Sequence, residues 1–171
     1  CIGMYGKEQD FYSLKGVITE LLKILGIRDA VFEAESEYGV YHPGRCARIA
    51  VPAKTEAMFD DDGFEELGIM GEIHPDVAEK YGMGDIRVYC CELMFDNIAR
   101  HADTEVVYTP LPKYPSTSRD IALLVDEDLE VGLIENVIAE NSGDILEKVE
   151  LFDVYRGKQI GEGKKSVAFA L

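Results

Sequence analysis

The sequence "LFDVYRGKQIGEGKKSVAFAL", from Leu151 to Leu171, predicts two β-strands joined by a glycine-punctuated loop. Successive side chains of a strand point to opposite faces of the sheet, so each strand can be divided into two faces. In the second strand Val167, Phe169 and Leu171 share one face, and these bulky side chains are expected to pack on a helix. The opposite face of the sheet is then left open.

Two-residue periodicity places alternate side chains of the first strand on one side of the sheet: Leu151, Asp153 and Tyr155. Ser166 of the second strand is expected on the same side, where the small Ala168 leaves room for a flat ligand. A tyrosine ring can stack on an unpaired base, and a carboxylate can accept the imino and amino hydrogens of guanine. We therefore predict base contacts through Asp153, Tyr155 and Ser166.

The connecting loop gathers four cations around one acid, Glu162; we call these four the basic rim: Arg156, Lys158, Lys164 and Lys165. The segment before it, 126–153, carries ten acids and one lysine. A local positive rim suits phosphate contacts that position a ligand without reading its sequence. Ordinary solvent-exposed surface is the alternative interpretation of the same residues.

The formal net charge of −16 argues against a general nucleic-acid-binding surface and against DNA as a partner, because such affinity depends on Lys and Arg neutralising phosphates. Any contact with nucleic acid must be local. No apolar run approaches the roughly 20 residues that span a bilayer, so we expect a soluble, cytoplasmic protein with no membrane partner.

Other candidate sites are weaker. The four cysteines, Cys1, Cys46, Cys90 and Cys91, form no C-x-x-C pair and are expected to be buried free thiols. The acidic run "DDDG" at 60–63 lacks the spacing of an EF-hand loop. We find no nucleophile elbow, no P-loop and no H-E-x-x-H motif, and so predict no catalytic residue and no metal site.

The three histidines have local interpretations. His42 lies in "YHPGR" (41–45), where a structural turn is favoured over an anion site. His74 precedes Pro75 at the start of a short helix, where local hydrogen bonding is expected. His101 stands alone in the sequence.

The first part of the chain mixes helix and strand signals. Asp10 can cap a helix from about 11 to 26, with Gly26 at its end. Strands are then expected at 30–36, 46–52, 64–73 and 87–95, with a short helix at 74–83. The segment 102–118 contains three prolines and little periodicity, which predicts a boundary between two domains, 1–108 and 109–171.

The second part reads as strand, helix, strand, strand. Residues 119–125 alternate, 145–155 and 164–171 are β-rich, and one helical stripe lies between them: Val131, Ile134, Val137 and Ile138. This order is the first three-quarters of a ferredoxin-like β-α-β-β-α-β unit. Without the last helix and strand, the strand 119–125 is expected to have an open edge.

Five blocks in order resemble the C-terminal part of the bacterial phenylalanyl-tRNA synthetase β chain family: "DFYSLKG" (10–16), "YHPGRCARI" (41–49), "GEIHPDV" (71–77), "YPSTSRDIALLV" (114–125), and "LFDVYRG" with "GEGKKS". The resemblance implies an α+β fold, with a class II synthetase-like antiparallel sheet module followed by an incomplete ferredoxin-like β-α-β-β domain. It also implies that Asp153, Tyr155 and Ser166 contact the first anticodon base, a guanine.

The resemblance further implies partners and a reaction for the intact enzyme, an α2β2 heterotetramer that uses ATP and Mg²⁺ to attach phenylalanine to tRNA-Phe. Within it, this chain is a noncatalytic scaffold for the α subunit and an anticodon reader, with no cofactor of its own. The alternative is an acidic protein-interaction module that uses the open sheet face, with Tyr155 as anchor. An independent hydrolase or metal enzyme is the weakest possibility.

Overall fold

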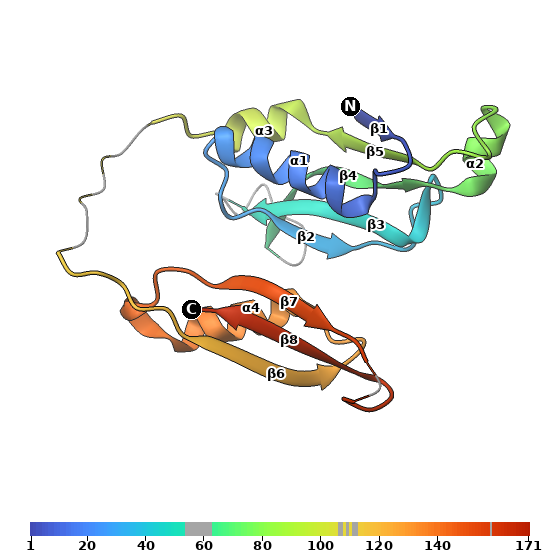
Figure 1. Cartoon of the computed structure of the whole chain (residues 1–171). Helices are drawn as coiled ribbons and strands as arrows, with labels where there is room; N and C mark the ends of the chain where they lie inside the picture. The colour runs from blue at the N-terminus through green and yellow to red at the C-terminus, as the bar shows by residue number, and fades with distance from the viewer. Residues whose placement is uncertain (54–62, 106–107, 109, 111–112, 158) are drawn as a thin grey trace. The chain divides into compact units, whose positions relative to one another are not determined.

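The computed structural model describes all residues except 54–62, 106–107, 109, 111–112 and 158. The chain forms two compact units, Cys1–Tyr108 and Thr109–Leu171, each built on its own antiparallel sheet (Figure 1). The predicted α+β fold class is thereby confirmed. The acidic run that begins at Asp60 falls outside the described residues, apart from Gly63.

The first unit contains a five-stranded sheet in the order β1-β5-β4-β3-β2, in which every neighbouring pair is antiparallel. Its strands are β1 (Ile2–Tyr5), β2 (Val31–Ala34), β3 (Tyr41–Pro52), β4 (Phe64–Ile73) and β5 (Val88–Leu93). The helices are α1 (Phe11–Ile24), α2 (Pro75–Lys80) and α3 (Phe95–His101). Figure 1 shows α1 and α3 on the same side of this sheet.

Helix α1 begins with a capping box, in which Ser13 N donates to Asp10 Oδ1 at 2.7 Å and Asp10 N donates to Ser13 Oγ at 3.3 Å. Its inward stripe of Leu14, Ile18 and Leu22 is fully buried. These residues pack with side chains of the central strands, including Ile49, Leu67, Met70 and Cys91. The sheet needs this helix because that face is almost entirely apolar.

Gly26 follows the C-cap of α1, where the chain must both turn and pass close to another segment. Its φ of +76° is in the left-handed region, and a Cβ there would lie 1.7 Å from the backbone oxygen of Asp103. The same approach allows Asp103 N to donate to Leu25 O at 2.9 Å. Glycine is therefore required at this position for two reasons, the left-handed φ and the close approach of the Asp103 backbone.

The second unit contains a three-stranded sheet in the order β6-β8-β7, with helix α4 (Val131–Asn141) on one face. The strands are β6 (Asp120–Asp126), β7 (Glu150–Tyr155) and β8 (Lys164–Ala170). Both outer strands pair antiparallel with β8. Among the described residues β6 has β8 as its only strand partner.

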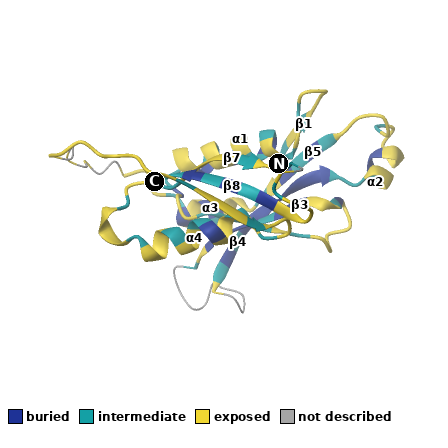
Figure 2. Cartoon of the chain, turned by 60° about the horizontal axis from the view of Figure 1, so that its bottom comes forward, coloured by how far each residue is buried: buried dark blue, intermediate teal, exposed yellow. Residues whose placement is uncertain are grey.

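The core of the second unit joins Ile134 of α4 to Val167 and Phe169 of β8. Buried and partly exposed residues alternate along β8 (Figure 2). Val137, expected on the inward stripe of α4, is instead 59% exposed.

Some sequence expectations need correction. Helix α1 ends at Ile24 and β3 begins at Tyr41, five residues before the expected start. Phe95 does not end β5 but begins α3, a helix that the sequence patterns did not predict. Ile98 and His101 are the buried residues of that helix. Two buried positions are too few to show helical periodicity in the sequence.

Candidate nucleic-acid interface

Asp153, Tyr155 and Ser166 lie on the face of the β6-β8-β7 sheet opposite α4, which we call the open face. Tyr155 is directly opposite Ser166, and Ser166 is directly opposite Leu124 on β6. In the next row Asp153 is opposite Ala168. Because directly opposed residues project to the same side of a sheet, the three predicted contact residues share one surface.

The open face presents both apolar and polar groups to solvent. Tyr155 is 43% exposed and Leu124 is 59% exposed. Within the described part of the chain, the Asp153 carboxylate and the Ser166 hydroxyl make no side-chain hydrogen bond. Their hydrogen-bonding capacity is therefore open to a ligand, although their roles as base contacts stay predictions.

A β-bulge at Phe152 changes the expected face of one residue. Leu151 is opposite Phe169, whereas Asp153 is opposite Ala168, so Phe152 has no partner on β8. Leu151 therefore falls on the side of the core residue Phe169 and not beside Asp153, as simple alternation had predicted. A bulge adds one residue to one strand, which reverses the alternation before it.

Two cations of the basic rim are held by acids at the end of β6. Arg156 Nε donates to Glu127 Oε1 at 2.6 Å, and Lys164 Nζ donates to Asp126 Oδ1 at 2.5 Å. All four side chains are largely exposed. The positive charge of this part of the rim is therefore locally compensated, and any phosphate must compete with these carboxylates.

The other two rim residues do not support phosphate contacts in the same way. Lys165 is only 6% exposed, lies opposite Val125 on the helix side, and its Nζ donates to Glu127 O at 2.9 Å. This burial removes Lys165 from the set of cations that could reach a phosphate. Lys158 lies outside the described residues.

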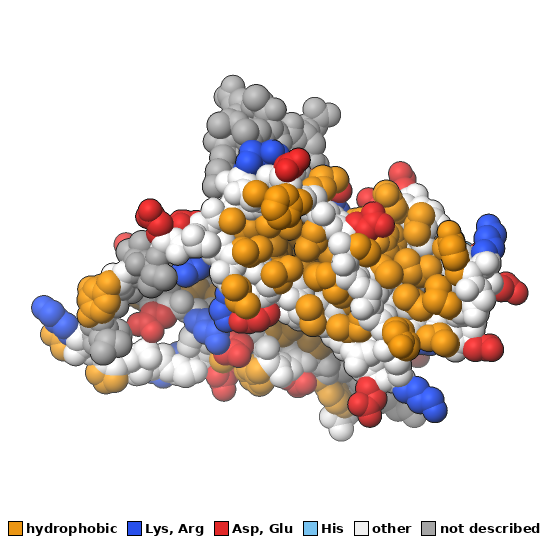
Figure 3. Space-filling view, turned by 90° about the horizontal axis from the view of Figure 1, so that it is seen from above, with side chains coloured by type: hydrophobic (Ala, Val, Ile, Leu, Met, Phe, Trp, Pro, Cys, Tyr) orange, Lys and Arg blue, Asp and Glu red, His pale blue; other side chains and the backbone are white. Residues whose placement is uncertain are grey.

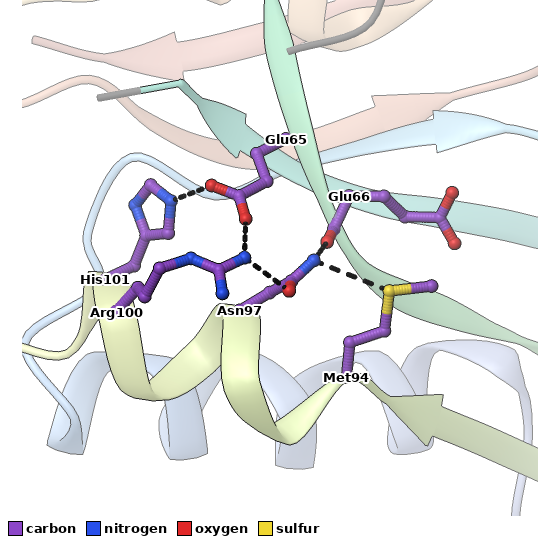
Figure 4. Close-up of polar contacts among 6 residues, drawn as sticks. All are labelled: Glu65, Glu66, Met94, Asn97, Arg100 and His101. Carbon is purple, nitrogen blue, oxygen red and sulfur yellow. Dashed lines mark hydrogen bonds and ion pairs between the residues drawn. The ribbon is translucent and has the colours of Figure 1, made fainter. Parts of the chain in front are cut away.

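His101 does not stand alone, as the sequence suggested, but belongs to a buried polar cluster in the first unit. Figure 4 shows His101 and Arg100 of α3 pointing at the carboxylate of Glu65 on β4. His101 Nε2 lies 2.7 Å from Glu65 Oε2, Arg100 donates to Glu65 Oε1, and Asn97 donates to Glu66 O at 2.6 Å. These contacts attach α3 to the beginning of β4, the central strand of the sheet.

The electrostatics of Glu65 reflect this attachment. Desolvation by burial would raise its pKa, but the hydrogen bonds from Arg100 and His101 outweigh burial and hold the pKa below its ordinary value. Glu65 is therefore a paired carboxylate and not a free acid or base. The cluster therefore has a structural role, because it links α3 to β4.

The remaining histidines also have local partners. His42 Nδ1 accepts from Gly44 N at 3.0 Å, and His74 Nδ1 accepts from Asp76 N at 3.2 Å at the start of α2. Arg45 binds Glu72 through two hydrogen bonds of 3.0 and 2.9 Å. These contacts support the structural interpretation of "YHPGR" and confirm the local role of His74.

The cysteines offer no reactive thiolate in the core. Burial raises the pKa of Cys46 to about 11 and that of Cys91 to about 12. Cys1 is exposed, contrary to the expectation that all four thiols are buried. In the described ranges no group of His, Cys, Asp and Glu could hold a metal ion, and no helix there is long and apolar enough to cross a membrane.

Comparison with known families matches both units. Residues 112–171 match the family model described as "Ferredoxin-fold anticodon binding domain", and residues 1–95 match "Phenylalanyl tRNA synthetase beta chain CLM domain". The second unit therefore belongs to the class of ferredoxin-fold anticodon-binding domains.

Curated relatives make the assignment specific. The chain is 44% identical over 99% of its length to a "Phenylalanine--tRNA ligase beta subunit" of Clostridium tetani, 41% identical over 95% to that of Symbiobacterium thermophilum, and 36% identical over 96% to that of Bacillus subtilis. The chain belongs to the phenylalanine-tRNA ligase beta subunit family. It spans about a fifth of the length of these relatives, 20%, 17% and 19% respectively.

Proposed function

We propose that the open face reads the first anticodon base of tRNA-Phe, a guanine. The observation that carries the proposal is the placement of Asp153, Tyr155 and Ser166 on adjacent strands of one exposed surface. The match of this unit to an anticodon-binding family supports the choice of RNA as ligand.

Each side chain has a distinct part in this reading. The Asp153 carboxylate accepts the N1 and N2 hydrogens of guanine, which adenine cannot supply in the same geometry. The Tyr155 ring stacks on the base, and the Ser166 hydroxyl adds a hydrogen bond to the base or sugar. Discrimination then comes from Asp153, and Tyr155 adds stacking affinity that does not depend on which base is present.

Phosphate contacts come from the exposed cations of the rim, Arg156 and Lys164, together with Lys158. Arg156 and Lys164 exchange their present partners, Glu127 and Asp126, for phosphate oxygens when RNA binds. Both ion pairs are solvent-exposed, so their exchange costs little. Binding to the rim therefore weakens with added salt.

The anticodon proposal is tested with synthetic anticodon stem-loops that carry G or A at the first anticodon position. Asp153→Asn is expected to weaken binding of the G stem-loop about tenfold, because a bidentate base contact is worth about 1–3 kcal/mol. The matched control is Glu150→Gln, which removes an exposed acid from the same strand. Equal losses for the G and A stem-loops would exclude base reading by Asp153.

The intact ligase, in this proposal, acts in the cytoplasm and attaches phenylalanine to tRNA-Phe with ATP and Mg²⁺. The described residues provide no metal-ligand set, and the thiols of the core are protonated. In this proposal the chain takes no chemical step of that reaction. Its own contribution is to orient the anticodon and to support the catalytic α subunit in an α2β2 assembly.

An exposed apolar surface of the first unit supports the scaffold role. Figure 3 shows apolar side chains gathered on the face formed by α1 and α3. The exposed large apolar residues of α1 and of the start of α3 are Tyr12, Val17, Ile24, Met94 and Phe95. A patch of this kind is typical of protein interfaces, because leaving it in water is unfavourable.

Association with the ligase α subunit, followed by size-exclusion chromatography, tests this role. Phe95→Glu is expected to weaken the complex, because Phe95 is 79% exposed within the patch. Tyr81→Glu is the control, since Tyr81 is 76% exposed but lies at the end of α2. The same complex with both variants would exclude this patch as the α contact.

A second candidate function is an acidic protein-interaction module that uses the open face. The observation in its favour is the exposed apolar pair formed by Leu124 and Tyr155, which flank Ser166 in one row. Such a pair could anchor a protein partner. No binding of either stem-loop at low salt would favour this function over RNA reading.

A further inference from the structure

Gly157 lies against the aromatic ring of Tyr155. A Cβ built on Gly157 would be 2.2 Å from Tyr155 Oη, 2.5 Å from Cζ and 2.8 Å from Cε1. All three distances are below those that real Cβ atoms show. The outer half of the ring therefore occupies the space in which any other residue would have its side chain.

The reason for glycine at this position is steric and not conformational. The φ of Gly157 is outside the left-handed region, so an L-residue could adopt its backbone. Gly161 and Gly163 of the same loop differ in both respects. Their φ angles are +88° and +72°, and a Cβ on either would have nothing within 4 Å. The loop thus contains two glycines that allow turns and one that leaves room for a ring.

We infer that Gly157 is a positioning residue for Tyr155, holding the phenol ring in the orientation in which it meets a base. The effect of this positioning on RNA binding rests on the proposed function, whereas the contact between the ring and Gly157 does not. Side chains on strands stand roughly perpendicular to the sheet and lean along the strand. Here the ring leans from the end of β7 toward the loop, and the backbone of Gly157 supports its hydroxyl end.

Gly157→Ala is expected to displace the ring without unfolding the unit. Tyr155 is 43% exposed, so its ring can rotate away from a new methyl group into solvent. The backbone needs no change, and alanine restricts the unfolded chain more than glycine does. The free energy of unfolding is therefore expected to be unchanged or slightly higher, while the stacking surface is lost.

The packing itself is tested by NMR on the 171-residue chain without RNA. An aromatic ring that rests on Gly157 shifts the Gly157 Hα signals through its ring current, most of all for the Hα that points along the direction of the built Cβ. Tyr155→Leu is expected to remove that shift. Gly157 Hα shifts that are the same in wild type and Tyr155→Leu would overturn the inference, whatever the chain binds.

The consequence for binding is tested by a double-mutant cycle with the guanine-bearing stem-loop. Gly157→Ala is expected to weaken binding about tenfold in the wild-type background, within the usual value of one base-aromatic stack, and to have no effect in the Tyr155→Leu background. Gly132→Ala in α4 is the control, because a Cβ there meets nothing within 4 Å. Wild-type affinity in Gly157→Ala would overturn the inference. Failure of the wild-type chain to bind would contradict the proposed function, and the NMR result would still decide the packing.

Discussion

Lys164 pairs with Asp126, the residue directly opposite it at the end of β6, through a 2.5 Å contact between Nζ and Oδ1. The adjacent Glu127 holds Arg156 in the same way. These acids lower the net charge that the rim offers to RNA. In a chain of net charge −16, this arrangement disfavours nonspecific binding to phosphates.

Neutralising both acids is therefore expected to strengthen nonspecific RNA binding. In Asp126→Asn with Glu127→Gln, Arg156 and Lys164 meet phosphates without competition from these two carboxylates. The slope of log K against log salt should become steeper by about 0.7 for each further phosphate that the rim neutralises. Titrations of G and A stem-loops at several salt concentrations measure it, and an unchanged slope would show that the two acids do not limit the rim.

Replacing Lys165 is expected to affect stability and not the salt slope. Lys165 is buried and donates to Glu127 O, so Lys165→Ala leaves a backbone acceptor without its charged donor and costs about 1.5–3 kcal/mol. Lys164→Ala, at an exposed ion pair, should cost less than about 1 kcal/mol. Urea unfolding compares the two variants. Equal stabilities would contradict the buried placement of Lys165.

Gly26→Ala is expected to be strongly destabilising. The left-handed φ alone costs about 1–2 kcal/mol, and the added Cβ also collides with the backbone of Asp103. Gly16→Ala in α1 is the matched control, because a Cβ there meets nothing within 4 Å. The control should gain about 0.5–1 kcal/mol. Thermal unfolding should show a lower melting temperature than wild type for Gly26→Ala and a higher one for Gly16→Ala.

Local patterns were sufficient to predict several elements of the fold. The Asp10 cap, the apolar stripe of α1 and Gly26 mark one helix in the sequence, and alternation assigns Ser166 to the open face. The same alternation places Lys165 on the buried side, whereas the concentration of charge in the loop favours, wrongly, an exposed phosphate contact. Alternation assigns each residue of a strand to one face of the sheet. The number of charges in a loop, in contrast, does not show where an individual side chain points.

Other features depend on contacts between distant segments and could not be read locally. The bulge at Phe152 exists only relative to β8, and the tie between His101 and Glu65 joins residues 36 positions apart. Likewise the contact of Gly157 with Tyr155 depends on how one ring leans. Sequence alone shows a glycine in a loop that contains two others, with no sign that its role differs from theirs.

The cluster of Glu65, Arg100 and His101 predicts a pH-dependent stability of the first unit. The pKa of Glu65 is below its ordinary value of 4.5 in the folded protein. A lowered carboxyl pKa contributes stability that is present above the unfolded pKa and is lost as the pH falls through the folded pKa. Glu65→Gln should therefore be less stable than wild type at pH 7, by about 1–3 kcal/mol, because Arg100 and His101 lose their charged acceptor.

This difference should narrow below about pH 4.5, where the carboxylate in wild type becomes protonated too. Glu66→Gln is the matched control, since Figure 4 shows its carboxylate pointing away from the cluster. Urea unfolding at a series of pH values measures both variants. A difference between wild type and Glu65→Gln that stays constant from about pH 7 to about pH 3 would show that the contacts of Glu65 do not depend on its charge.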